Sequence, residues 1–84
     1  MPTTTFSSQS TSLKLLRFGQ RGIITGINTL QDTTVQKLRR MGLTCGQMIT
    51  LEQRFPRFII RAGNTSHALD DIAINAIYVR VVDH

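Results

Sequence analysis

Alternating apolar and polar positions predict short strands along much of the chain. Within residues 47–55, Ile49 and Leu51 fall on one face, and polar residues fall on the other. A period of two is typical of a strand with one buried face. Four further short segments are predicted to be strands, at residues 22–27, 57–62, 65–69 and 77–82. The pattern therefore predicts a mainly β protein with five strands.

Two glycine positions predict departures from regular strands. Gly63-Asn64 separates the third and fourth predicted strands and is a two-residue hairpin signal. Gly26 interrupts the first, and an isolated glycine inside a strand suggests a bulge or a sharp bend. In that strand we expect Ile23 and Ile27 to share one face, two residues either side of Thr25.

A helical period appears between the first and second predicted strands. Val35, Leu38 and Met41 are spaced three apart and are expected to line one face of a helix. This helix spans about two turns, which is too short to be stable alone, so it must pack on the strands. The arrangement predicts a small antiparallel barrel with one short α-helix, a fold that leaves few strand edges free.

The expected helix carries signals at both ends. Thr33 with Gln36 fits a capping box at its start. Gly42 fits the left-handed position after a helix, where a residue without Cβ is least strained. Leu43 then falls where a Schellman motif makes its hydrophobic contact, which would be with Leu38.

The remaining segments complete the expected organisation. Residues 1–12 are rich in Ser and Thr and predict a flexible tail, followed by one barrel domain over residues 13–84. Before the last strand, a single turn is predicted to begin at Asp70 or Asp71.

Composition narrows the function classes. The chain has 84 residues, a net charge of +5 and a single cysteine, Cys45, which we expect to be a buried or half-buried turn residue. One cysteine cannot form an internal disulfide, and residues 1–12 lack the apolar core of a secretory signal. No apolar run approaches a membrane span of about 18 residues. We therefore expect a cytoplasmic protein without membrane insertion.

Chemistry-bearing motifs are missing from the sequence. It contains no phosphate-binding loop of the Gly-x-x-x-x-Gly-Lys-[ST] type and no nucleophile beside a histidine, so no enzyme and no catalytic residue is predicted. No ligand pair has metal-binding spacing, so neither a metal site nor a cofactor is expected. The metal candidates considered are Cys45, His67, Asp70, Asp71, Asp83 and His84.

Three stretches resemble the ferrous iron transport protein A (FeoA) family. They are GQRGIITGI, KLRRMGLTCGQMITLE and ALDDIAINAIYVRVV, within residues 13–82, and the Leu-x-x-Met-Gly-Leu-x-x-Gly junction in the second is the most specific. The resemblance implies a five-stranded SH3-like barrel. It also implies a cytoplasmic accessory protein of the FeoB-type transporter, a membrane protein with a GTP-binding domain. The loop EQRFPRF is shorter than the family's usual loop, and the tail is additional.

Basic residues suggest where a partner would bind. Cations are concentrated at the end of the predicted helix and in the turn after the second predicted strand, where they flank Phe55. Arginine pairs well with the carboxylates of a partner, and an aromatic residue beside it can anchor an interface. The candidate partner-binding residues are Arg39, Arg40, Met41, Phe55 and Arg57. As alternatives, the cations form solvated faces, Met41 belongs to the core, or the barrel binds RNA or another single-stranded nucleic acid. Only Phe55 and Tyr78 are available for base stacking, so nucleic acid is not the expected partner. Self-association is left open.

Overall fold

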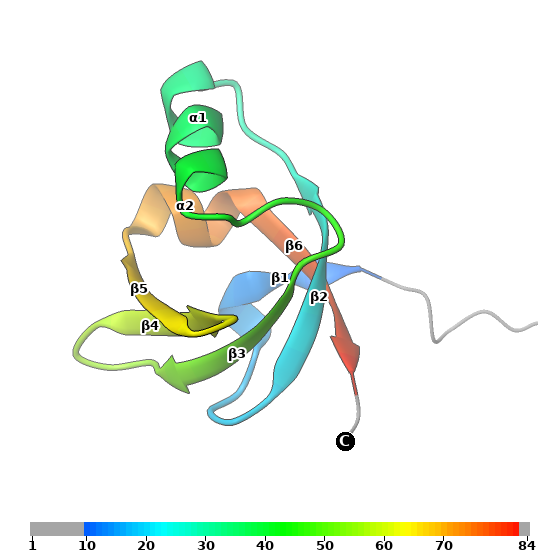
Figure 1. Ribbon diagram of the computed structural model, residues 1–84, viewed down its shortest axis with the longest axis vertical. Coiled ribbons are helices and arrows are strands. Elements are labelled where there is room, and N and C mark those ends of the chain that lie inside the picture. The colour runs from blue at the N-terminus through cyan, green and yellow to red at the C-terminus, as the bar shows by residue number, and fades with distance from the viewer. Residues whose placement is uncertain (1–9, 83–84) are drawn as a thin grey trace, which may run out of the picture.

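The computed structural model describes residues 10–82, which form one antiparallel sheet that coils around a core and carries two short α-helices at one end (Figure 1). The sheet has six strands in the order β1-β6-β2-β3-β4-β5. The elements are β1 (Thr11–Ser12), a 3-10 helix η2 (Leu13–Leu15), β2 (Arg21–Ile27), α1 (Asp32–Arg40), β3 (Met48–Gln53), β4 (Phe58–Ala62), β5 (Thr65–Leu69), α2 (Asp71–Ala76) and β6 (Ile77–Val82).

All five predicted strands are present, but the predicted count is wrong by one. The additional strand is β1, in which Thr11 pairs with Val79 and Ser12 with Tyr78 of β6. As a result α1 connects the second and third strands rather than the first and second. The predicted flexible tail of residues 1–12 includes Thr11 and Ser12. Residues 1–9 of that tail lie outside the described residues.

A bulge in β2 changes which residues face the core. Ile24 pairs with Val79 and Gly26 with Tyr78, so Thr25 is an extra residue between the two pairs. Before the bulge Ile24 points inward and is buried; after it Ile27 packs against the core. Gly26 therefore marks the predicted bulge. The expectation that Ile23 and Ile27 share a face is wrong, because one extra residue reverses the alternation.

The junction after α1 is a Schellman motif, as predicted. Gly42 has a φ of 80°, and its N–H donates to the carbonyl oxygen of Arg39 at 3.0 Å. The Leu43 N–H donates to the carbonyl oxygen of Leu38 at 2.9 Å, and both leucine side chains are fully buried. This junction fixes the end of α1 to the core where the chain turns toward β3.

The start of α1 differs from the expectation. The helix begins at Asp32 with Gln31 in the capping position, and no side chain there caps the helix. Instead the Thr34 hydroxyl donates to Oε1 of Gln31 at 3.3 Å. The predicted capping box of Thr33 and Gln36 is therefore wrong, because the helix begins before Thr33.

The predicted turn before the last strand is a second helix. In α2 the carboxylate of Asp70 accepts a hydrogen bond from the Ala73 N–H at 2.9 Å, so Asp70, rather than Asp71, is the cap. The expectation of a single α-helix is thus corrected to two. Among residues 10–82, no helix is long and apolar enough to cross a membrane.

Candidate partner-binding groove

A groove opens where the hydrophobic core reaches the surface beside α2. Its volume is about 640 Å³, and its floor is formed by Phe58, Leu69 and Ile74. These side chains are 8%, 8% and 9% exposed, whereas every other residue of the buried core is at most 2% exposed. The groove is therefore one place where an outside apolar group could contact the core directly. We call it the α2 groove.

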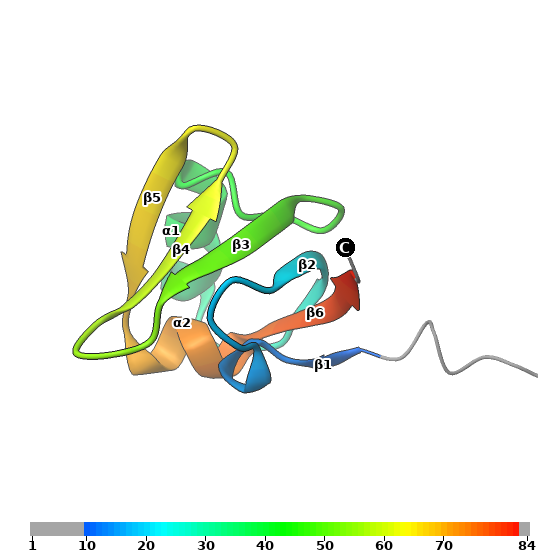
Figure 2. The same cartoon turned by 90° about the horizontal axis from the view of Figure 1, so that it is seen from below.

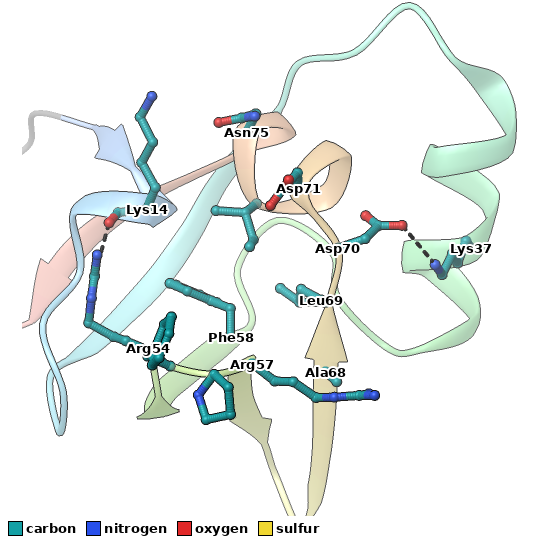
Figure 3. Close-up of a pocket in the computed structure, with 13 residues that line it drawn as sticks. Lys14, Lys37, Arg54, Arg57, Phe58, Ala68, Leu69, Asp70, Asp71 and Asn75 are labelled. Carbon is teal, nitrogen blue, oxygen red and sulfur yellow. Dashed lines mark hydrogen bonds and ion pairs between the residues drawn. The ribbon is translucent and has the colours of Figure 1, made fainter.

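Both cations and acids lie on its rim, and Lys37 and Asp70 are paired there (Figure 3). The cations Lys14, Arg54 and Arg57 come from η2 and the β3–β4 turn, while Asp71 and Asn75 come from α2. The remaining members of the lining are Lys37, Phe55, Pro56, Ala68 and Asp70. The Phe55–Pro56 peptide bond is cis.

Arg54 holds the two basic segments of the rim together. Its Nη1 donates to the carbonyl oxygen of Lys14 at 3.0 Å and to that of Leu16. The guanidinium carbon also lies 5.7 Å from the centre of the Phe58 ring, within the range of a cation–π contact. These contacts fix the β3–β4 turn against η2, although the two segments are 40 residues apart in sequence.

Arg57 differs from Arg54 because its guanidinium forms no ion pair or hydrogen bond within the described residues. The amide of Gln53 donates to the Arg57 carbonyl oxygen at 3.2 Å, which positions the backbone. Within residues 10–82 the ion pairs are Lys37–Asp70 and Arg61–Glu52, so the Arg57 guanidinium has no acidic partner there. Next to it Phe55 is 87% exposed. An exposed aromatic ring beside a free arginine is a common pair of interface anchors.

Two carboxylates have a lowered pKa, and one of them, Asp70, lines the groove. The N–H of Ala73 holds the pKa of Asp70 below its usual value, and Lys37, with its Nζ 3.3 Å from Oδ2, acts in the same direction. On the outer face of the sheet, the Ser66 hydroxyl and then Arg61 lower the pKa of Glu52. Their distances to Glu52 are 2.6 and 2.8 Å. Both carboxylates are therefore held in their charged form at neutral pH.

The structure brings together two of the five predicted partner-binding residues. Phe55 and Arg57 line the α2 groove. Arg39 and Arg40 are exposed at the end of α1, and Met41 is half-buried against the core. Arg39 lines a second, smaller hollow of about 390 Å³, together with Ile27, Val35, Thr44 and Cys45. A role of these residues in binding stays a prediction.

Sequence reasoning did not identify most of the groove. Lys14, Arg54, Ile74 and Asn75 line it, but they come from segments far apart in the chain, and no local pattern joins them. Cys45 was expected to be at least half-buried, but it is exposed, because the turn after Gly42 carries it away from the core.

The sequence predicts no metal site, and the positions of the possible ligand side chains are known for residues 10–82. Across residues 10–82, no three His, Cys, Asp or Glu side chains are grouped so that they could hold a metal ion. Asp83 and His84 lie outside the described residues.

Comparison with known proteins relates this chain to one family of iron transport proteins. The FeoA domain family model matches residues 11–81. A candidate Fe(2+) transport protein A of Leptolyngbya boryana is 43% identical over 79 residues, covering 93% of this chain and 96% of the relative. A crystal structure of an iron uptake regulatory protein (FeoA) superposes with a TM-score of 0.79 at 28% identity, covering 88% of this chain and all of that one.

A third similarity concerns the fold. The zinc complex of Stenotrophomonas maltophilia FeoA, described as a procaryotic SH3 domain protein, superposes with a TM-score of 0.72. It is 19% identical, and the match covers 82% of this chain and 88% of that one. The coiled sheet thus has the fold of SH3-like FeoA structures, and the family supports a role in ferrous iron transport. From the family match and the relative's identity, the chain belongs to the FeoA family.

Proposed function

We propose that this chain is a non-enzymatic accessory protein of ferrous iron transport. It binds the cytoplasmic part of the FeoB-type transporter and modulates its assembly or activity from the cytoplasm. Family membership supports the link to iron transport. A relative in Stenotrophomonas maltophilia is described as a candidate activating factor of bacterial ferrous iron transport. The observation that carries the proposal is the α2 groove, where the core is open to an outside partner.

The chemistry of the groove suits a protein partner. An apolar side chain of the partner can contact Phe58 and Ile74 on the floor, while Arg57 pairs with a partner carboxylate at the rim. Binding energy in such interfaces is concentrated in a few aromatic and arginine anchors. Phe55 and Arg57 supply this pair beside the floor.

The groove is less suited to RNA. Of the two aromatic residues considered for stacking, Tyr78 lies in the middle of the sheet between β1 and β2 and is half-buried. A stacking site needs several accessible rings along one positive path. The described residues therefore favour the protein partner.

The direct test is a calorimetric titration of the full chain with the transporter's purified cytoplasmic domain and, in parallel, with single-stranded RNA. We expect a stoichiometric complex with the transporter domain that weakens modestly as salt is raised. RNA binding would fall much more steeply, with a log–log slope of about −0.7 for each phosphate neutralised. Binding to RNA and not to the transporter domain would reverse the proposal.

A further inference from the structure

One edge of the sheet is free beside the α2 groove. Among residues 10–82, β5 is terminal in the strand order and pairs only with β4, and Figure 2 shows no strand of this part of the chain beyond it. All five residues of β5 are in register with β4, without a bulge. A strand edge of this kind presents unpaired N–H and C=O groups to any extended chain that reaches it.

The register shows which groups these are. The hairpin between β4 and β5 has two loop residues, so its closing pair, Ala62 with Thr65, is expected to share hydrogen bonds. In an antiparallel ladder such pairs alternate, so Thr65, His67 and Leu69 bond to β4. The N–H and C=O groups of Ser66 and Ala68 therefore face away from β4.

An independent observation in β3 supports this assignment of which β5 residues bond to β4. Leu51, opposite Ile60, exchanges hydrogen bonds with Gly19 and Gln20 at 2.8 and 3.0 Å, so its polar groups face away from β4. Ile60 must then direct its own groups to β5, where its partner is His67. The free positions are again those on either side of His67.

The edge also lacks the features that normally block strand addition. Soluble proteins protect edges with lysines, prolines, bulges or a covering segment. β5 has the sequence TSHAL, with no Lys, Arg or Pro, and its pairing with β4 is regular.

The far end of this edge leads into the α2 groove. Ala68 and Leu69 belong to the lining, so a chain lying along β5 would reach the apolar floor. Figure 3 shows the Arg57 side chain extending past Ala68 toward this edge. An incoming strand would therefore meet free main-chain groups, an arginine without an acidic partner in residues 10–82, and the groove floor in succession.

We propose that this edge and groove together bind an extended, acidic segment of a partner protein, which adds to β5 as a further strand. Its main chain pairs with Ser66 and Ala68, a carboxylate pairs with Arg57, and an apolar side chain covers the groove floor. This inference rests on the proposed function, since it specifies what part of the transporter's cytoplasmic domain is bound. A second copy of this chain is disfavoured as the occupant, because each copy carries a net charge of +5 and its own Arg57 at the edge.

Amide hydrogen exchange can test the pairing residue by residue without any substitution. Exchange of the full chain is followed by NMR, alone and with the purified cytoplasmic domain of the transporter. The amides of Ser66 and Ala68 should exchange freely in the free protein and be protected by about tenfold or more in the complex. The His67 amide between them already bonds to β4, so its exchange should change little. This alternating pattern distinguishes strand addition from simple coverage.

A proline variant tests the same contact by affinity. Ala68→Pro removes an N–H that the sheet itself does not use, so the fold should be kept, while binding of the transporter domain should weaken by about tenfold. Ala68→Ser keeps the N–H and is the matched control. Circular dichroism of both variants reports whether the sheet is intact.

The outcomes separate the two proposals. Binding of the transporter domain without new protection at Ser66 and Ala68 would overturn strand addition and leave the proposed function standing. No binding at all would overturn both. Protection of the same amides in the protein alone, together with a dimer in solution, would show that a second copy occupies the edge and would overturn the acidic segment.

Discussion

At the scale of single residues, Gly42 is a position where the backbone conformation favours glycine. Its φ of 80° lies in the left-handed region, and a Cβ built there would meet no atom within 4 Å beyond the neighbouring residues of the chain. The cost of another residue therefore comes from the backbone conformation and not from a clash. Leu43 depends on this conformation, because its N–H bonds to Leu38 only if the chain reverses at Gly42.

Gly42→Ala should lower the free energy of unfolding by about 1 kcal/mol, because alanine is strained at positive φ. Gly42→Asn should cost less, since asparagine tolerates this region better. Urea unfolding followed by circular dichroism measures both. A Gly42→Ala protein as stable as the wild type would contradict the role assigned to this residue.

This residue-scale feature could be predicted because it is local. The Met-Gly-Leu sequence places a left-handed glycine and its hydrophobic partner within a few positions of each other. The exposure of Cys45 and the partial burial of Met41 depend on how distant segments pack. The residues next to them in the sequence therefore do not predict how exposed either side chain is.

At the scale of elements, α2 and β2 show how one residue can determine where a helix begins or which face of a strand is buried. Asp70 caps α2 through the Ala73 N–H and also pairs with Lys37 of α1, so it connects the two helices. In β2, the single extra residue at Thr25 decides which isoleucine enters the core. A glycine inside a strand predicts that a bulge exists, but the change of face that follows depends on the pairing with β6.

Asp70→Ala should destabilise the protein by about 1 kcal/mol, the usual cost of losing an N-terminal cap. Asp71→Ala is the matched control, because Asp71 is a neighbouring exposed acid without a capping bond. Thermal unfolding of the two variants, measured side by side, checks the assignment. Equal losses would mean that charge near the helix start, and not the cap, is responsible.

Stability should also fall in acid. Glu52 and Asp70 have a pKa below the usual value in the folded protein, owing first to the Ser66 hydroxyl and to the Ala73 N–H respectively. A carboxyl with a lowered folded pKa stabilises the protein above its unfolded pKa and loses this contribution as the pH falls through the folded value. The melting temperature should therefore decrease below about pH 5.

The variant Glu52→Gln separates one part of this effect. It removes the titrating group on the outer face of the sheet, so its melting temperature should depend less steeply on acid pH than that of the wild type. Asp70 is exposed and Glu52 is half-buried, so solvent reaches both groups and limits the size of the change. An unchanged slope in Glu52→Gln would assign the acid sensitivity to other carboxyls.

At the scale of the whole molecule, the fold was more predictable than the site. Periodicity identified five of the six strands and α1, because each pattern lies within one short segment. The two-residue strand β1 was missed, since two residues cannot show a period. The α2 groove was only partly anticipated, through Phe55 and Arg57. It forms where η2, the β3–β4 turn, β5 and α2 meet, and that meeting depends on how the whole sheet coils.

The central claim is that the α2 groove binds the cytoplasmic domain of the FeoB-type transporter. The most direct measurement is the affinity of that domain for Arg57→Glu compared with Arg80→Glu. Both substitutions change the net charge equally, but Arg57 lines the groove, while Arg80 is an exposed residue of β6 outside it. We predict that Arg57→Glu weakens binding by about tenfold or more and that Arg80→Glu leaves it nearly unchanged. Equal effects of the two variants, or wild-type affinity in Arg57→Glu, would contradict the account.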